Sequence, residues 1–418
     1  MSTTEQTVDR PLATSGGAAA LHALRSAKTV RERCRMVRRW VAAGHSPHFT
    51  LEEDRLGNVA DYVATLTRSA YPDLRIPPHS RWRHFTAGGV DRWRRLEQSI
   101  ADPVARARTA VDLATVSVLL DAGAGERWRY REPADGRAFA RSEGLAVASI
   151  DLFAAGGFSC DARRPLQADA AALQALGTET LAHGFQAGPD NPLVGLERRA
   201  DLLRRLGRAL AARPELYGSP GRPGHLVDFF LRTAPDGRLP AALILETLLD
   251  SLSSIWPSGL VVDGIPIGDA GRHPAARTGD ASDGIVPFHK LSQWLAYSLI
   301  EPLAAAGLTV TALDGLTALA EYRNGGLLID LGLIRPRRPI EGPQAPSCEL
   351  VVEWRALTVV LMDELLVPVR QRLGLGAEFA LPHLLQGGTW SAGRKIALKL
   401  RPPGGPPPFP LIADGTVF

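Results

Sequence analysis

Apolar residues recur every three or four positions through most of this chain, and charged residues, chiefly arginine, occupy many of the positions between them. This spacing is typical of amphipathic helices. It predicts helices over residues 18–43, 52–69, 102–120, 168–212, 241–254 and 348–373. Short hairpins are favoured at Asp135-Gly136 and Asp263-Gly264. We therefore predict a mainly α, multi-helix globular fold with a few short hairpins.

Two polar or turn-rich stretches divide this helical pattern. Residues 1–17 are polar and are predicted to form a disordered tail. Residues 214–224 are rich in proline and glycine, and we place a domain boundary there. The predicted division is an N-terminal helical lobe over residues 18–213 and a C-terminal helical lobe over residues 225–418, which would carry most of the functional site.

Composition narrows the class of protein. The chain has 418 residues, 45% of them hydrophobic and 22% charged, as in an ordinary soluble globular protein. Its 48 basic and 44 acidic residues give a net charge of only +4, and no basic tract is interleaved with aromatic residues, so nucleic acid is not a predicted partner. Three well-separated cysteines favour a reducing cytoplasm. Neither a signal peptide nor a membrane-spanning stretch is predicted.

The segment 286–300 contains the clearest chemical signal. It predicts a largely buried helix that begins near Pro287, at a position suited to proline. Polar residues nevertheless fall within one sector of about 100° on this helix: His289, Lys290, Gln293 and Tyr297. Such a stripe must be satisfied by protein partners, water or a ligand. It therefore indicates either a structural network or a binding site.

A second polar group follows closely in the chain. Thr311 or Asp314 can cap a short helix that ends in Glu321-Tyr322-Arg323. We expect Asn324-Gly325-Gly326 to terminate this helix, because Asn and Gly accept a positive φ. A carboxylate, a phenol and a guanidinium beside a glycine turn make a plausible site rim. The alternative is a Glu321–Arg323 ion pair on a solvated surface.

Three further positions carry candidate site residues. Glu353 and Arg355 fall in the apolar half of the helix over residues 348–373, and a buried charge is either paired or functional. A structural pair of Glu353 with Arg323 or Lys290 is the alternative. The donor-rich segment 81–84 contains Trp82, Arg83 and His84 close to Gly88-Gly89, which suits an anionic group or is simply a solvated loop. Glu143 opens another helix and either caps it or contacts a ligand.

The chain contains no GxGxxG, Walker, GxSxG or HExxH motif, so we predict no cofactor and no metal. Its candidate carboxylates are Asp314, Glu321 and Glu353. Carboxylates can stabilise an oxocarbenium ion or transfer a proton to a leaving group. Together with nearby cations, which could hold an anionic handle such as a sugar phosphate, they suit cleavage of an N-glycosidic bond.

Several long motifs resemble the bacterial and fungal uracil-catabolism (URC pathway) family, long described as a domain of unknown function. They lie at residues 81–85, 141–149, 287–295, 316–326, 352–356 and 414–418, so the resemblance covers nearly the whole chain after residue 17. In that pathway uracil is converted to its ribonucleotide, the ring is opened, and a ribosylurea-type intermediate yields urea. The resemblance implies a protein that acts late in the pathway, near urea release.

Three motifs are also similar, in the same order, to the queuosine-phosphate nucleoside hydrolase family, an N-glycosylase family that splits a base from a ribose phosphate. They are Phe288–Gln293, Leu316–Arg323 and Val352–Arg355. This similarity implies a mainly α architecture related to helical DNA glycosylases. Where that family has Asp-Tyr-Arg, this chain has Glu321-Tyr-Arg, and Ser298 occupies a position expected to be acidic. Both differences leave the identity of the catalytic acid open.

These observations predict a cytoplasmic hydrolase that cleaves the N-ribosyl bond of ribosylurea, or of its 5′-phosphate, to release urea. Glu321 would be the carboxylate at the anomeric centre, with Asp314 or Glu353 as a positioning group. The predicted substrate-binding residues are His289, Lys290, Gln293, Tyr322, Arg323, Arg355, Trp82, Arg83, His84 and Glu143. Two alternatives are a metal-assisted amidohydrolase that acts on the ureido group and a non-catalytic binding subunit of the ring-opening enzyme. Contacts with other pathway enzymes are also expected.

Overall fold

The structure is a computed structural model, and it describes residues 15–256 and 259–412. The fold is mainly α, as predicted, with short two-stranded sheets between the helices. Three long helices organise it: α6 (Pro103–Leu119), α14 (Lys290–Ala305) and α16 (Glu349–Leu373). None of the described helices is both long and apolar enough to cross a membrane.

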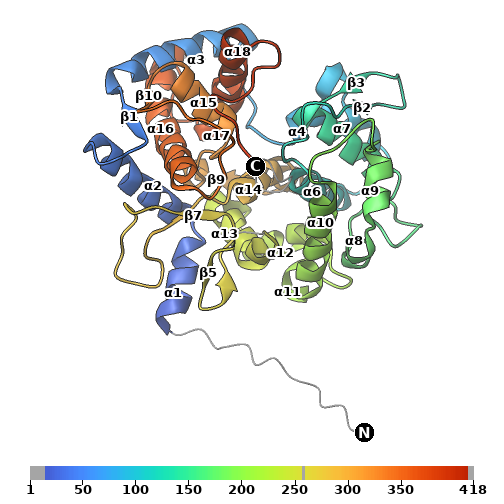
Figure 1. Cartoon of the computed structure of the whole chain (residues 1–418). Helices are drawn as coiled ribbons and strands as arrows, with labels where there is room; N and C mark the ends of the chain where they lie inside the picture. The colour runs from blue at the N-terminus through green and yellow to red at the C-terminus, as the bar shows by residue number, and fades with distance from the viewer. Residues whose placement is uncertain (1–14, 257–258, 413–418) are drawn as a thin grey trace.

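One side of the molecule combines helices from the two ends of the chain (Figure 1). The early helices α2 (Ala27–Ala42) and α3 (Leu56–Ala70) pack on α16 because their apolar stripes face it. The late helices on this side are α15 (Tyr322–Asp330), α17 (Leu381–Leu384) and α18 (Trp390–Leu400). A two-stranded antiparallel sheet, β1 (Phe49–Leu51) with β10 (Ile334–Pro336), joins the same early and late segments.

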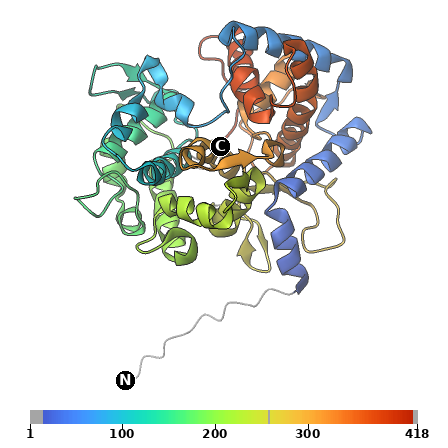
Figure 2. The ribbon, with the colours of Figure 1, turned by 180° about the vertical axis from the view of Figure 1, so that it is seen from behind.

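The opposite side is built from the middle of the chain, and the view from behind shows the same division (Figure 2). Its helices are α4 (Trp82–Phe85), α5 (Arg92–Glu97), α6, α7 (Arg141–Ala154), α8 (Ala170–Ala175), α9 (Thr178–Gly184), α10 (Leu196–Ala211), α11 (Pro214–Tyr217) and α12 (Leu226–Thr233). Helix α14 packs against α6 and α13 (Ala241–Leu252), and it lies in the middle of the molecule in Figure 1.

The remaining strands form small pairs. Both predicted hairpins are confirmed: β2 (Tyr130–Arg131) pairs with β3 (Ala138–Phe139), and β5 (Val261–Val262) pairs with β6 (Ile265–Pro266). Two longer-range pairs are β4 (Arg238–Pro240) with β9 (Thr309–Thr311), which is parallel, and β7 (Ala270–Arg272) with β8 (Ile285–Pro287), which is antiparallel.

Hydrophobic clusters extend across the predicted boundary at residues 214–224, and the division into two lobes stays a prediction. The two largest hydrophobic clusters each contain residues from both predicted lobes, for example Val63 with Leu357 and Val111 with Leu299. Helix α1 (Ser15–Leu24) begins inside the predicted tail, whose residues 1–14 lie outside the described part of the chain. The motif at residues 414–418 also lies outside it.

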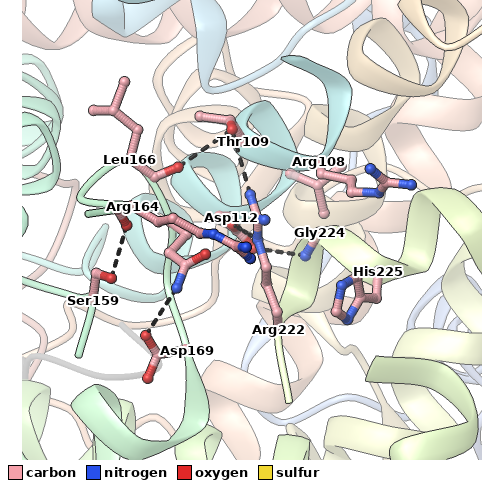
Figure 3. A network of polar contacts seen from close by, with 12 residues as sticks. Arg108, Thr109, Asp112, Ser159, Arg164, Leu166, Asp169, Arg222, Gly224 and His225 are labelled. Atoms are coloured by element: carbon pink, nitrogen blue, oxygen red, sulfur yellow. Dashed lines mark hydrogen bonds and ion pairs between the residues drawn. The ribbon is translucent and has the colours of Figure 1, made fainter. Parts of the chain in front are cut away.

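A polar network fixes the start of α12 to the middle of α6 (Figure 3). Asp112 is fully buried on α6 and accepts hydrogen bonds from the Arg222 guanidinium and from Gly224 N, at 2.6 Å for the latter. Burial, opposed by Arg222, raises the pKa of Asp112 to about 6. Arg108, one turn earlier, pairs with Asp228 at 2.6 Å. These bonds anchor the turn-rich segment that the sequence marked as a boundary.

Two predicted helix boundaries are wrong. Helix α14 begins at Lys290, because Pro287 belongs to strand β8, where it is paired with Ala270, and His289 takes a left-handed conformation. Helix α15 begins after Glu321, so Glu321 caps its N-terminus and does not lie at the end of a preceding helix.

Asn324-Gly325-Gly326 continues this helix and does not end it. A Cβ on Gly325 would lie 2.6 Å from Thr358 Oγ1 and 2.7 Å from the Trp354 ring, so the glycine allows α15 to approach α16 closely. Helix packing outweighs the turn propensity of this tripeptide.

Candidate functional site

Asp269 fixes the turn that starts α14. Its main-chain oxygen accepts hydrogen bonds from Phe288 N and His289 N, at 2.9 and 3.0 Å. Its carboxylate accepts one from Lys290 N at 2.9 Å. His289 is thereby held at φ 51°, a conformation that costs a non-glycine residue energy and persists only where the surroundings impose it. The predicted polar stripe therefore begins in a constrained turn, not in a regular helix.

Arg355 connects this turn to Glu321. Its guanidinium donates to both carboxylate oxygens of Asp269, at 2.9 and 2.7 Å, and its Nε donates to Ala320 O at 3.3 Å. The guanidinium also lies over the Phe288 ring, 4.1 Å from its centroid. Arg355 thus holds the start of α14 beside the start of α15, which places it in a positioning role.

Glu321 is the N-cap of α15. Its carboxylate oxygens accept hydrogen bonds from Arg323 N at 2.7 Å and Asn324 N at 2.6 Å. Burial raises the pKa of Glu321, and these backbone bonds together with the Lys290 charge offset only part of that effect. The cap fixes the carboxylate rigidly while leaving each oxygen a second lone pair. A carboxylate with a raised pKa is a better proton acceptor than an ordinary one.

Among the charged side chains that lower the pKa of Glu321, Lys290 has the largest effect. Burial, followed by repulsion from Arg355, lowers the pKa of Lys290 to about 8, while Asp269, Glu321 and Asp121 act in the opposite direction. The ammonium group is therefore a stronger acid than that of an ordinary lysine. Its interaction with Asp121 also shows that the start of α14 faces the end of α6.

Asp121, just after α6, was not predicted as a site residue. It forms an ion pair with Arg81 at 2.8 Å, and both side chains are at least nine-tenths buried. Arg81 Nη1 also donates to His84 Nδ1 at 3.1 Å, which requires the His84 proton to lie on Nε2. Burial and the Arg81 charge lower the pKa of His84 to about 4, so this imidazole is neutral. Within the described chain, Asp121 Oδ1 and Arg81 Nη2 have no hydrogen-bond partner.

Glu143 and three arginines, Arg141, Arg323 and Arg394, are the remaining members of this set of charged residues. Arg394 of α18 donates to Glu143 of α7 at 2.6 Å. Arg141, at the start of α7, interacts electrostatically with Arg323, Arg394 and Glu143. We refer to this group as the charged cluster; its members are Arg81, His84, Asp121, Arg141, Glu143, Lys290, Glu321, Arg323 and Arg394. It joins α7 on one side of the molecule to α15 and α18 on the other (Figure 1).

The charged cluster includes five of the thirteen predicted site residues directly: Glu321, Lys290, Arg323, His84 and Glu143. Two more support it. Arg355 acts through Asp269, and the Tyr322 ring lies under the Arg323 guanidinium, 4.8 Å from ring centroid to Cζ.

The other predicted residues have structural surroundings. Trp82 Nε1 donates to Ser298 O at 2.8 Å, and Arg83 pairs with Glu301. Gln293 Oε1 accepts from Thr317 N at 3.3 Å, next to the bond that Tyr297 donates to Thr317 O. These contacts fix α4 and the segment before Glu321 onto α14.

His289 and the two additional carboxylates also lie in different surroundings from Glu321. His289 Nε2 donates to Leu24 O at 2.9 Å. Glu353 accepts from Ser46 Oγ and from His273 Nε2, the latter at 3.0 Å, so its partners are not the expected Arg323 or Lys290. Asp314 is exposed on the short 3₁₀ turn Leu313–Gly315.

A cavity of about 550 Å³ lies elsewhere, among α1, α11, α12 and α13. Arg25, Arg213 and Asp250 line it, and it contains none of the predicted site residues. Among the described residues, no group of three or more His, Cys, Asp or Glu side chains is arranged to hold a metal ion.

Asp121, Asp269 and Arg394 gave no usable signal in the sequence. Asp121 reads as the end of a helix, Asp269 lies in a loop after a hairpin, and Arg394 is one of many helical arginines. Their importance depends on contacts with residues far away in the chain, such as Arg81, Arg355 and Glu143.

Two known proteins are similar in sequence to this chain over most of its length. It is 38% identical over 431 residues to the protein named uracil catabolism protein 4 of Lachancea kluyveri, covering 94% of this chain and 98% of that protein. It is 40% identical over 385 residues to protein urg3 of Schizosaccharomyces pombe, covering 88% and 92% respectively. A family model described as a protein of unknown function, DUF1688, matches residues 23–418. The chain therefore belongs to the DUF1688 family.

Proposed function

We propose that this protein acts in uracil catabolism and hydrolyses the N-ribosyl bond of ribosylurea, or of its 5′-phosphate, to give urea and the free sugar. The name of the Lachancea relative supports the pathway. The observation that carries the reaction class is Glu321: a half-buried, rigidly held carboxylate with a raised pKa beside a lysine with a lowered pKa. Paired groups whose pKa values are shifted in this way suit acid–base catalysis.

The proposed reaction balances with water as the only co-reactant. The bond between C1′ and the ureido nitrogen breaks, and the Glu321 carboxylate stabilises the positive charge that develops on the sugar. Glu321 accepts a proton from water as the water oxygen bonds to C1′. The Lys290 ammonium gives a proton to the departing nitrogen, which leaves as urea. Transfer of a proton from Glu321 to Lys290 restores both groups.

The position of Glu321 fits this role better than the positions of the other two candidate carboxylates. Glu353 is engaged by Ser46 and His273, and Asp314 is exposed. Asp121 lies across the charged cluster, where its charge acts on Lys290. Arg355 and Asp269 would hold Lys290 and Glu321 in fixed positions relative to each other.

The direct test supplies purified full-length protein with ribosylurea, with and without the 5′-phosphate, and follows urea and sugar by mass spectrometry. Urea with intact ribose or ribose 5-phosphate supports N-glycoside cleavage. Ammonia and carbon dioxide without urea would instead indicate hydrolysis of the ureido amide bond. A folded protein that binds either compound without product would indicate a binding subunit.

Glu321→Gln isolates the proposed carboxylate. We expect it to lower kcat by at least about 100-fold, the usual contribution of a positioned proton acceptor. Stability should fall by only about 1 kcal/mol, because the amide oxygen preserves one of the two cap bonds. Glu126→Gln, at an exposed position, is the matched control and should retain activity. A collapse of stability in Glu321→Gln would make Glu321 a structural cap only.

A further inference from the structure

Three arginines from three separate elements meet at one edge of the charged cluster. Arg141 begins α7, Arg323 lies in the first turn of α15, and Arg394 lies on α18. Arg141 has φ 55°, a left-handed conformation that is unfavourable for a residue with a side chain. We propose that Arg141, Arg323 and Arg394 bind the phosphate group of a phosphomonoester substrate. This inference rests on the proposed function and selects ribosylurea 5′-phosphate as the substrate.

A glycine pair orients two of these guanidinium groups. Arg141 Nη2 donates to Gly404 O at 2.6 Å, and Arg323 Nη1 donates to Gly405 O at 2.7 Å. The carbonyls belong to consecutive residues, so the two guanidinium groups are held next to each other although like charges repel. Gly405 is required here, since a Cβ would lie 2.7 Å from Leu398 N.

The third guanidinium is held in a comparable way. Arg394 donates to Glu143 and lies over the Trp390 ring, 5.6 Å from its centroid, as Arg323 lies over Tyr322. Cation–π contacts of this kind fix a planar guanidinium without using its N–H groups. Within the described chain, each of the three guanidinium groups donates only one hydrogen bond. The remaining donors suit the oxygens of a phosphate group.

The local charge also favours a dianion. The charged cluster has five cationic side chains and three carboxylates, Asp121, Glu143 and Glu321, and its His84 is neutral, so the net charge of the cluster is +2. Repulsion from Arg323 and Arg394 adds to the effect of burial and lowers the pKa of Arg141, which shows that the positive charges are not fully neutralised. A phosphomonoester carries about −1.5 to −2 charges at pH 7 and offers three acceptor oxygens.

The arrangement places the anion site beside the reacting groups. Arg323 is two residues from Glu321, and its backbone N–H donates to the Glu321 carboxylate. A sugar whose anomeric carbon faces Glu321 would extend its 5′-phosphate toward the arginines. The phosphate would thus act as a handle that orients the N-ribosyl bond.

The first test measures binding of ribose 5-phosphate and of ribose to full-length protein by titration calorimetry. We expect ribose 5-phosphate to bind at least tenfold more tightly than ribose. Arg141→Gln and Arg394→Gln should each remove most of that difference, whereas Arg95→Gln, the same charge change at an exposed position on α5, should preserve it. Arg394→Lys keeps the charge but loses the planar fork, and we expect an intermediate loss. Thermal unfolding of each variant controls for folding.

A second measurement separates this inference from the proposed function. With both ribosylurea substrates, kcat/KM should favour the phosphorylated one, and Arg141→Gln should remove the preference. Equal binding of ribose and ribose 5-phosphate would overturn the phosphate site even if ribosylurea is cleaved. Arginine-dependent binding of ribose 5-phosphate without cleavage of either substrate would support the phosphate site and overturn the proposed reaction. Equal effects of Arg141→Gln on both substrates would also overturn the phosphate site.

Discussion

The guanidinium of Arg355 and the carboxylate of Asp269 form a buried bidentate pair, with N–O distances of 2.9 and 2.7 Å. Burial opposes ionisation of Asp269, but Arg355 and the bond from Lys290 N outweigh it, so the pKa of Asp269 lies below its usual value. The pair therefore joins α16 to the turn that presents Lys290.

Replacing one partner of this pair should be costly. We expect Asp269→Ala to lower the free energy of unfolding by about 3–5 kcal/mol, because it leaves the Arg355 charge buried without its partner. Urea unfolding measures this loss. The double variant Asp269→Ala/Arg355→Met should recover part of it, since both charges are then absent. A loss below about 1 kcal/mol in the single variant would show that the site does not depend on the pair.

The close contact between α15 and α16 gives a second prediction. Gly325→Ala would place its Cβ 2.6 to 2.7 Å from Thr358 and Trp354, so the helices would have to separate. We expect a loss of about 1–3 kcal/mol in unfolding free energy. Gly326→Ala is the matched control, because its Cβ would approach only Pro408, at 3.3 Å. Equal stability of the two variants in urea unfolding would contradict the proposed packing role of Gly325.

Local pattern and tertiary contacts explain which predictions succeeded. The apolar periodicity of residues 102–120 and 348–373 is a property of the segments themselves, and both are helices in the structure. The Asn324-Gly325-Gly326 tripeptide is typical of a helix end when its sequence is considered alone. In the structure it lies inside α15, because the contact of α15 with α16 requires a small residue at Gly325. The start of α14 was misplaced for a similar reason, because strand pairing and Asp269 decide it.

In the candidate site, too, contacts between segments that are distant in the sequence could not be predicted. Glu321 and Lys290 were predicted because they stand out within their own segments, and the structure places both in the charged cluster. The partner of Glu353 could not be predicted, because His273 lies in a loop far away in the sequence. Asp121 and Arg394 similarly become notable only through Arg81 and Glu143.

Two buried histidines predict how stability depends on pH. Burial lowers the pKa values of His79 and His84 to about 4, whereas an unfolded histidine titrates near about 6.5. The unfolded chain therefore binds more protons between these values, and the stabilising contribution present above pH ~6.5 is lost as pH falls toward 4. We expect the free energy of unfolding to rise with pH in this range by up to about 1.4 kcal/mol per pH unit for each histidine.

Urea unfolding is measured at pH values from 7 to 5. Asp112, with a pKa of about 6, titrates in the same window with the opposite sign, so the contribution of His79 is taken as the difference in slope between the variant and the unmodified protein. His79→Gln should reduce the slope by the contribution of one proton. His45→Gln, at an exposed position, is the control and should leave the slope unchanged. The same slope in His79→Gln and in the unmodified protein would show that His79 does not exclude protons in the folded state.

Lys290 predicts the alkaline side of the activity profile. If its ammonium supplies the proton to the departing nitrogen, kcat/KM should fall about tenfold per pH unit above pH ~8, where Lys290 loses that proton. Lys290→Arg keeps the positive charge but cannot release a proton in this range, so we expect a loss of about 100-fold or more and no limb near pH 8. Lys399→Arg, on an exposed part of α18, should retain the profile of the unmodified protein. An alkaline limb that persists near pH 8 in Lys290→Arg would assign the titration to another group and leave Lys290 as a fixed charge beside Glu321.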